Sequence, residues 1–350
     1  MAEPSTPRSL QSSDAAPACC PKIRAWLQLM RIANLPTAIS NVAAGLFLAL
    51  PPFQFQANSI DIQMLIAAVF VSASLYVSGM ILNDAFDAKV DTVERPNRPI
   101  PSGRIDQKTA FKVGFGMIVL AITIPAILLL REVITGVNGR ATSLLGLLET
   151  SVVLAICVVL YDGPLKKTWL AAPLMGCCRT LNVLLGVFAT TRSDLLLWHS
   201  ATAQPWFAYA FLIGLLVAGV TLLARSETKT RQSRLWLAVG AATMLVALTS
   251  LFRLPHFVHY ALEIPYLTTK QAYWAMLAII AFPIVRRLIV AVRTATPQTV
   301  GPAIGTSLSS LIFLDAAVCF LVRPDQPLYA GAVALLIIPV MLLRRFSAQT

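Results

Sequence analysis

Ten apolar runs dominate this chain, and they limit it to folds that satisfy backbone hydrogen bonds inside a membrane. Only 13% of the 350 residues are charged, about half the usual share of a soluble domain. Helices that span the hydrocarbon core need roughly 17 to 25 apolar residues. The runs are 33–50, 61–83, 110–130, 143–161, 171–190, 206–224, 235–252, 272–292, 303–322 and 327–343.

These runs predict an all-α, polytopic membrane bundle of nine or ten transmembrane helices. The last two runs can be two crossings or one broken element. Residues 1–22 are rich in Ser, Pro and Ala and contain no long apolar run. They predict a disordered cytoplasmic tail rather than a signal peptide. Residues 23–350 are expected to form a single transmembrane domain.

The basic residues predict the orientation. With ten spans and a cytoplasmic N-terminus, 21 of the 28 Lys and Arg residues fall in cytoplasmic segments, six fall outside and Arg179 lies within a span. Membrane proteins carry this excess in their cytoplasmic loops. The net charge of +12 therefore requires no nucleic-acid partner. We expect an integral multi-pass protein among membrane lipids, in the inner membrane of a bacterial cell.

A stripe of acids follows the second run, in the segment NDAFDAKVDTVE. At about 100° per residue, Asp84, Asp87 and Asp91 share one face of a helix, and Asn83 and Glu94 widen that face. Stacked carboxylates repel one another, and acids beside hydrocarbon usually mark function. Oxygen donors suit Mg²⁺ or Mn²⁺, and Mg²⁺ usually keeps substrate phosphates among its ligands. The predicted metal ligands are Asn83, Asp84, Asp87 and Asp91.

Arginines come next, in ERPNRPIPSGR. Pro96 disfavours helix at Arg95, so the helix is predicted to end there. Arg95, Arg98 and Arg104 then lie on a loop stiffened by prolines, and guanidinium groups match phosphate oxygens. Acids for a metal beside arginines for phosphate predict a compact diphosphate site.

The segment NDAFDAKVD matches the NDxxDxxxD signature of the UbiA superfamily of intramembrane prenyltransferases, and RPNRPIPSGRI resembles that family's continuation. Weaker similarity runs through most of the chain from RIANLPTAISNVAAG onward. The resemblance implies a bundle around a central cavity that opens to lipid and admits a prenyl diphosphate donor. It implies Mg²⁺ as cofactor, with Asp84, Asp87 and Asp91 as catalytic residues. The prenyl group would pass to a lipophilic, often aromatic, acceptor.

Two lysines follow the fourth run, in YDGPLKKTW. The family offers cations to the diphosphate in this region, and the resemblance extends that role to Lys166 and Lys167. Ordinary positive-inside lysines are the alternative. Tyr161 and Asp162, beside them, are candidates for the base that deprotonates an acceptor.

Several polar residues lie within the runs. Arg179 and Asn182 share a helix face, and an arginine in a span must be paired or face a wet cavity. We expect both to bind substrate, with a structural salt bridge as the alternative for Arg179. Asn34 and Asn41 either line the cavity, where Asn34 would bind substrate, or pin helices together. Asp315 has no evident partner.

The chain departs from the family after the sixth run. The family usually carries a second aspartate motif there, whereas LLARSETKTRQSRL contains no aspartate. Its acid, Glu227, is a weaker candidate metal ligand, and Arg225 and Lys229 are candidates to neutralise phosphates directly. The order Arg225-Ser226-Glu227 resembles the SRxE-like loop of a divergent, EboC-like branch.

Three functions follow from these patterns. The leading one is prenyl transfer with Mg²⁺-assisted ionisation of the diphosphate. A UbiA-type terpene cyclase would use the same ionisation without an acceptor, so product analysis without an acceptor separates the two. A non-catalytic transporter or scaffold for isoprenoid phosphates would release no diphosphate.

Overall fold

The computed structural model describes residues 21–50, 62–136, 140–189, 205–227, 234–256, 258 and 267–347. Within these ranges every regular element is a helix. The short elements are α1 (Pro21–Leu29), η1 (Ile32–Asn34), α13 (Pro327–Leu335) and α14 (Ile337–Ser347). The longer ones are α2 (Leu35–Ala49), α3 (Ile62–Glu94), α4 (Gln107–Thr135), α5 (Ala141–Asp162), α6 (Ala171–Val187), α8 (Pro205–Glu227), α9 (Arg234–Leu251), α11 (Leu267–Thr294) and α12 (Pro297–Val322).

The ten predicted runs all fall on helices, which confirms the all-α, polytopic prediction. Eight helical segments of the described part are long and apolar enough to cross a membrane, while α6 and the segment Pro327–Leu343 are shorter. The final run is interrupted at Leu336, between α13 and α14. α12 is an unbroken helix of 26 residues, and residues 323–326 separate it from α13, so the last two runs are separate helices and the final run is itself divided.

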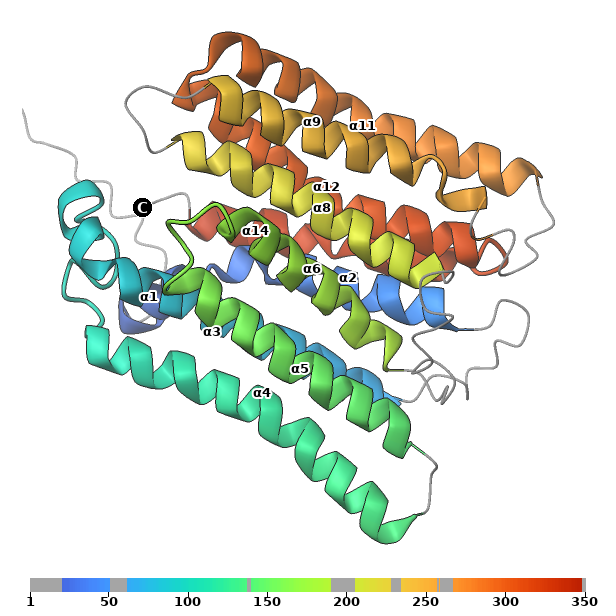
Figure 1. Ribbon diagram of the computed structural model, residues 1–350, viewed down its shortest axis with the longest axis horizontal. Helices are drawn as coiled ribbons and strands as arrows, with labels where there is room; N and C mark the ends of the chain where they lie inside the picture. The colour runs from blue at the N-terminus through green and yellow to red at the C-terminus, as the bar shows by residue number, and fades with distance from the viewer. Residues whose placement is uncertain are drawn as a thin grey trace, which may run out of the picture.

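The helices form two lateral groups with α2, α6 and α8 between them (Figure 1). On one side α3 packs against α4 and α5, and on the other α11 packs against α12 and α9. Between these groups α6 contacts α2, α5 and α8. The end of α3, the α5–α6 connection and α1 lie at the left end of the molecule in Figure 1. Segments far apart in the sequence therefore meet at one end of the bundle.

Two glycines allow α2 and α6 to touch through their backbones. A Cβ atom on Gly45 would lie 2.0 Å from the Val183 carbonyl oxygen, and one on Gly186 would lie 1.9 Å from that of Val42. Small residues let helices in membranes approach this closely. The contact holds the polar residues of α2 beside those of α6.

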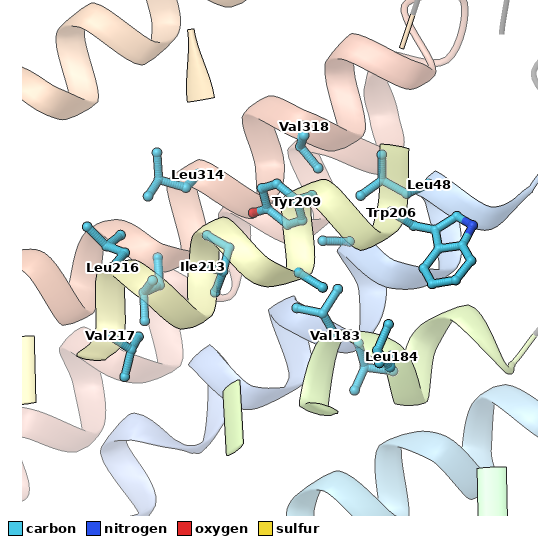
Figure 2. Packing of buried hydrophobic residues seen from close by; sticks show 14 of the residues in the cluster. Leu48, Val183, Leu184, Trp206, Tyr209, Ile213, Leu216, Val217, Leu314 and Val318 are labelled. Carbon is cyan, nitrogen blue, oxygen red and sulfur yellow. The ribbon is translucent and has the colours of Figure 1, made fainter. Parts of the chain in front are cut away.

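The apolar core is centred on α8. Figure 2 shows the α8 side chains lying among those of α2, α6 and α12. Burial of such side chains contributes packing contacts rather than hydrophobic free energy where the surroundings are lipid. The residues labelled there are Leu48, Val183, Leu184, Trp206, Tyr209, Ile213, Leu216, Val217, Leu314 and Val318.

A second, smaller core fixes the loop that follows α3. Ile100 and Ile105 of this loop are buried together with residues of α1, α3 and α4. The Gln107 side chain, at the start of α4, donates a hydrogen bond of 2.8 Å to the Ala85 carbonyl oxygen. These contacts hold the arginine-bearing loop against the last turns of α3.

Candidate functional site

The acid stripe lies on a helix that continues beyond its apolar run. α3 extends without interruption from Ile62 to Glu94 and ends where Pro96 was expected to end it. Asp84 and Asp91 are buried, with 5% and 3% of their surface exposed. Asp87 is half-buried, whereas Glu94 is exposed at the last turn. The carboxylates that matter for a site are therefore the three inner ones.

Arg98 joins two of these acids. Its Nη1 atom donates to Asp91 Oδ2 at 2.6 Å and to Asp84 Oδ1 at 3.2 Å. Arg31 Nη2 also donates to Asp84 Oδ1, at 2.9 Å. Charge-assisted bonds of this kind stabilise acids that would otherwise repel each other. The loop after α3 and the segment before η1 thus converge on one face of α3.

Lys166 joins Asn83 and Asp87, two further polar residues of the stripe. Its Nζ atom donates to Asp87 Oδ2 at 2.5 Å and also to Asn83 Oδ1. The adjacent Lys167 is exposed. The structure therefore separates the two neighbouring lysines, and only the side chain of Lys166 reaches α3.

We call this arrangement the acid cluster. Its members are Asn83, Asp84, Asp87 and Asp91 with Arg31, Arg98 and Lys166.

Arg31 belongs to the site although the sequence marked it only as one basic residue among many. Its backbone has φ 45° and ψ 46°, a left-handed conformation that is unfavourable for residues other than glycine. The Tyr76 hydroxyl donates to the Arg31 carbonyl oxygen at 3.1 Å. Unfavourable backbone conformations gather at functional sites. This signal is conformational, so sequence analysis had no access to it.

Arg225 supports the site indirectly, through the backbone of the α5–α6 connection. Its Nη2 atom donates to the carbonyl oxygens of Lys166, at 3.2 Å, and Thr168. It thereby holds the α5–α6 connection that carries Lys166. A direct contact between Arg225 and phosphate stays a prediction.

Arg95 and Arg104, which were also predicted for the site, make no ion pair with the acid cluster. Arg95 is exposed, and Arg104 Nη2 donates to the Asn97 carbonyl oxygen at 2.6 Å, which braces the loop. Glu227 is the last residue of α8, but its side chain is outside the described residues, as is all of Lys229. The role of the second loop as a replacement motif stays a prediction.

The acid cluster has the donor chemistry for Mg²⁺. All its candidate ligands are carboxylate or amide oxygens, as this ion requires. In the described part of the chain, no three His, Cys, Asp or Glu residues lie close enough together to hold a metal ion. Cationic nitrogens instead contact all three acids. A divalent cation would therefore have to displace at least one of these side chains, and the metal ligands stay a prediction.

A pocket adjoins the acid cluster between α2, α3, α5 and α6. It contains about 570 Å³ of space free of protein atoms, including its open mouth. Most of its wall is apolar, with polar groups from α3, α5 and α6. Its lining residues are Ala38, Ser72, Leu75, Tyr76, Gly79, Met80, Leu154, Val158, Tyr161, Asp162, Met175, Cys178, Arg179 and Asn182.

Arg179 lies on the wall of this pocket. Its guanidinium donates to Asn41 Oδ1 at 3.2 Å and to Thr37 Oγ1 at 3.3 Å. Among the described residues, no carboxylate oxygen lies within salt-bridge distance of it. The alternative of a structural salt bridge therefore has no support in the described part of the chain.

Asn182 has structural contacts as well as a place on the pocket wall. Its Oδ1 atom accepts a 2.6 Å bond from the Ser72 hydroxyl, and its Nδ2 atom donates to the Ala38 carbonyl oxygen at 2.8 Å. These bonds tie α6 to α3 and α2. Asn34 lies in η1, outside the residues that line the pocket.

Asp315 has partners that the sequence did not reveal. It accepts bonds of 2.6 Å from the Ser40 and Tyr209 hydroxyls, and Asn41 Nδ2 donates to both of its oxygens at 2.8 and 3.1 Å. These donors come from α2 and α8, whereas Asp315 is on α12. The expectation that Asp315 lacks an evident partner is thus wrong, because its partners are distant in the sequence.

Known structures resemble this fold. Digeranylgeranylglyceryl phosphate synthase gives a TM-score of 0.56 at 18% identity, over 87% of this chain and 100% of that one. A UbiA homologue from Aeropyrum pernix gives 0.56 at 15% identity, over 83% and 97%. Identities this low support similarity of fold alone.

Sequence comparison gives the family. Digeranylgeranylglyceryl phosphate synthase from Ignicoccus hospitalis is 30% identical over 170 residues, and that from Methanopyrus kandleri is 38% identical over 102. The matches cover 48% and 27% of this chain, and 48% and 35% of those proteins. The sequence model of the UbiA prenyltransferase family matches residues 38–299, three quarters of the chain. The chain therefore belongs to the UbiA prenyltransferase family.

Proposed function

We propose that this integral membrane protein transfers a prenyl group from a prenyl diphosphate to a lipophilic acceptor. The observation that carries the proposal is the acid cluster, in which three acids and three cations meet near a largely apolar pocket whose lining residue Tyr76 contacts Arg31. A prenyl diphosphate has a matching distribution of polarity, because its charged head suits the acid cluster and its apolar tail suits the pocket.

The acids and cations have separate roles in this proposal. Asp84, Asp87 and Asp91 would hold Mg²⁺, which when bound supplies Lewis-acid stabilisation of the leaving diphosphate. The cations that now contact these acids would turn to the phosphate oxygens, which offer the same kind of acceptor. The relevant cations are Arg31, Arg98 and Lys166.

The pocket would keep water away from the reacting groups. Departure of diphosphate from an allylic carbon leaves a resonance-stabilised cation that water would quench. Leu75, Met80, Val158 and Met175 line the pocket, and an apolar wall of this kind excludes water from reactive intermediates. The prenyl tail would lie along such apolar helix faces.

A glyceryl phosphate lipid is the first acceptor to test. The related synthases carry that group in their names. Arg179, a pocket-lining cation whose described contacts are to neutral oxygens, is the candidate partner for an anionic group on the acceptor. Its five N–H donors suit a phosphate.

The site is proposed to face the cytoplasm. The support is the distribution of basic residues, 21 on the side of the acid cluster against six on the other. Modification of single introduced cysteines, one beside the exposed Lys167 and one beside Arg131, would test this in intact cells. A bacterial inner membrane stays a prediction.

The primary test is stabilisation by the donor. Purified protein is heated with geranyl, farnesyl or geranylgeranyl diphosphate, with and without Mg²⁺, as wild type, Asp87→Asn and Asp106→Asn. Asp106 is the matched control because it is exposed and caps α4. Mg²⁺-dependent stabilisation is expected in the wild type and the control, and its loss in Asp87→Asn.

Turnover extends this test. We expect prenyl transfer by Asp87→Asn to fall roughly 10²–10³-fold, the size typical of losing one preorganised electrostatic contact. Full activity in that variant would refute the assignment of the acids. Stabilisation without diphosphate release would favour a scaffold or transporter, and release of a cyclic product without an acceptor would favour a terpene cyclase.

A further inference from the structure

One acid in the pocket stands apart from the acid cluster. Asp162, the last residue of α5, is only 3% exposed. Its Oδ2 atom is buried and has no hydrogen-bond partner among the described residues. A buried acceptor without a donor is unfavourable, because it has lost its hydrogen bonds to water. Because Asp162 also lines the pocket, a ligand bound there is able to supply the missing donor.

The depth of Asp162 in the pocket distinguishes it from the proposed metal ligands. A Cβ atom on Gly79 would lie 3.7 Å from Asp162 Oδ2, so this oxygen is level with Gly79 on α3. Gly79 precedes Asn83 by four residues, which is about 6 Å along a helix. The Asp162 carboxylate therefore lies about one turn deeper than the acid cluster, where the reactive carbon of a donor would enter the pocket.

The charged groups around Asp162 have other partners. Those close enough to interact with it electrostatically are Lys166, Asp87, Arg31 and Asp84. The two cations among them are already bonded to acids of α3. Asp162 is thus adjacent to the proposed diphosphate site without belonging to its ion pairs.

We propose that Asp162 binds the hydroxyl group of the acceptor and takes its proton during transfer. This inference rests on the proposed function and assigns the acceptor to a chemical class, an alcohol or phenol on an apolar body. The hydroxyl donates to Oδ2, which supplies the partner that this atom otherwise lacks. Hydrogen bonding also fixes which lone pair of the acceptor oxygen faces the donor carbon.

The step is balanced without an oxidant or reductant. The bond between the allylic carbon and the diphosphate oxygen breaks, and its electron pair leaves with the diphosphate. A lone pair of the acceptor oxygen forms the new carbon–oxygen bond. The hydroxyl proton moves to Asp162 Oδ2, so the products are a prenyl ether, diphosphate and a protonated Asp162, which later releases that proton.

The test compares wild type, Asp162→Asn and Asp106→Asn. Asparagine keeps the shape of the buried side chain but cannot take the proton. Each protein is saturated with Mg²⁺ and geranylgeranyl S-thiolodiphosphate, a slowly ionising donor analogue. It is then heated with geranylgeranylglyceryl phosphate, 4-hydroxybenzoate or a long-chain phenol, each paired with its O-methyl ether.

We expect at least one hydroxyl probe to raise Tm more than its ether in the wild type and in Asp106→Asn. Asp162→Asn should keep the stabilisation by the donor analogue, which also shows that it folds, and should reduce the difference in Tm between hydroxyl and ether, because a neutral amide oxygen is a weaker acceptor than a carboxylate. With the reactive donor, transfer to that probe should fall about 10²–10⁴-fold, the usual contribution of a general base.

Three results would overturn the inference. The difference in Tm between hydroxyl and ether could be as large in Asp162→Asn as in the wild type, or no probe could show that difference in the wild type. Loss of Mg²⁺-dependent donor stabilisation in Asp162→Asn would instead make Asp162 part of the cation site. Failure of the donor analogue to stabilise even the wild type would count against the proposed function, which is a different outcome.

Discussion

The acid cluster and Asp315 differ in the groups that contact their carboxylates. In the acid cluster, Asp84, Asp87 and Asp91 are contacted by arginine and lysine side chains. Asp315 instead accepts hydrogen bonds from two hydroxyls and an amide. Among the described residues, no cationic nitrogen lies within salt-bridge distance of Asp315.

The difference separates structure from function. The donors to Asp315 are side chains on packed helices and are almost completely buried, so they cannot exchange for a ligand. The cations of the acid cluster are long, and Arg31 and Lys166 keep 36% and 25% of their side chains exposed. They can release a carboxylate and bind a phosphate. We infer that the Asp315 group holds α2, α8 and α12 together, whereas the acid cluster binds ligand.

The largest expected effect comes from Asp315→Leu. This change leaves the Asn41 and Tyr209 donors without an acceptor, at about 1–3 kcal/mol each, while the Ser40 hydroxyl keeps the Thr37 carbonyl oxygen as an acceptor. Since total stability is typically about 5–15 kcal/mol, we expect little folded protein. Yield of monodisperse protein in detergent and its thermal unfolding would measure this. Normal yield and Tm would show that the Asp315 group does not hold the helices.

The next largest effect is expected at Lys166, and the neighbouring Lys167 serves as its control. Lys166→Gln removes a charge-assisted contact worth about 1.5–3 kcal/mol, so we expect prenyl diphosphate to bind roughly ten- to a hundredfold more weakly. Lys167→Gln, at an exposed position, should change binding less than about threefold, as surface charges do. Titration of the two variants at saturating Mg²⁺ would measure both. Equal losses of affinity in the two variants would contradict the assignment of Lys166 alone to the diphosphate site.

A smaller effect is expected from Tyr209→Phe, which removes one donor to Asp315 and leaves the other two. We expect a loss of about 1 kcal/mol in stability, the typical net value of one hydrogen bond. The affinity for the prenyl diphosphate at saturating Mg²⁺ should not change, because Tyr209 lies outside the acid cluster. A change in the affinity for the prenyl diphosphate without a change in Tm would contradict the structural role of Tyr209.

The smallest effect is expected from Glu227→Gln. A lone acid at the end of α8, followed by a basic loop, would hold a metal weakly through water. Loss of activity should stay below about tenfold, under the roughly 10–100-fold losses seen when a group that orients a metal ligand is removed. Direct comparison with Asp87→Asn measures this. An equal or larger loss would indicate that Glu227 replaces the missing second aspartate motif.

The sequence predicted the parts of the molecule that depend on local patterns. Hydropathy located the ten helical runs, because a helix that crosses hydrocarbon must be apolar over its own length. The spacing of Asp84, Asp87 and Asp91 and the position of Pro96 predicted a polar extension of α3 and its end. Both signals lie within a few turns of one helix.

The tertiary structure decided which residues meet. Arg31 and Lys166 contact acids that are 53 and 79 residues away in the sequence, and Asp315 finds donors 106 and 275 residues away. Lys166 and Lys167 are the same type of residue at adjacent positions, and only the geometry of the α5–α6 connection distinguishes them. Sequence alone thus determined the membrane helices and the acid stripe, because these follow from local solvation and helical periodicity. Only packing of the helices chose the partners of each charge, because that choice depends on contacts between distant segments.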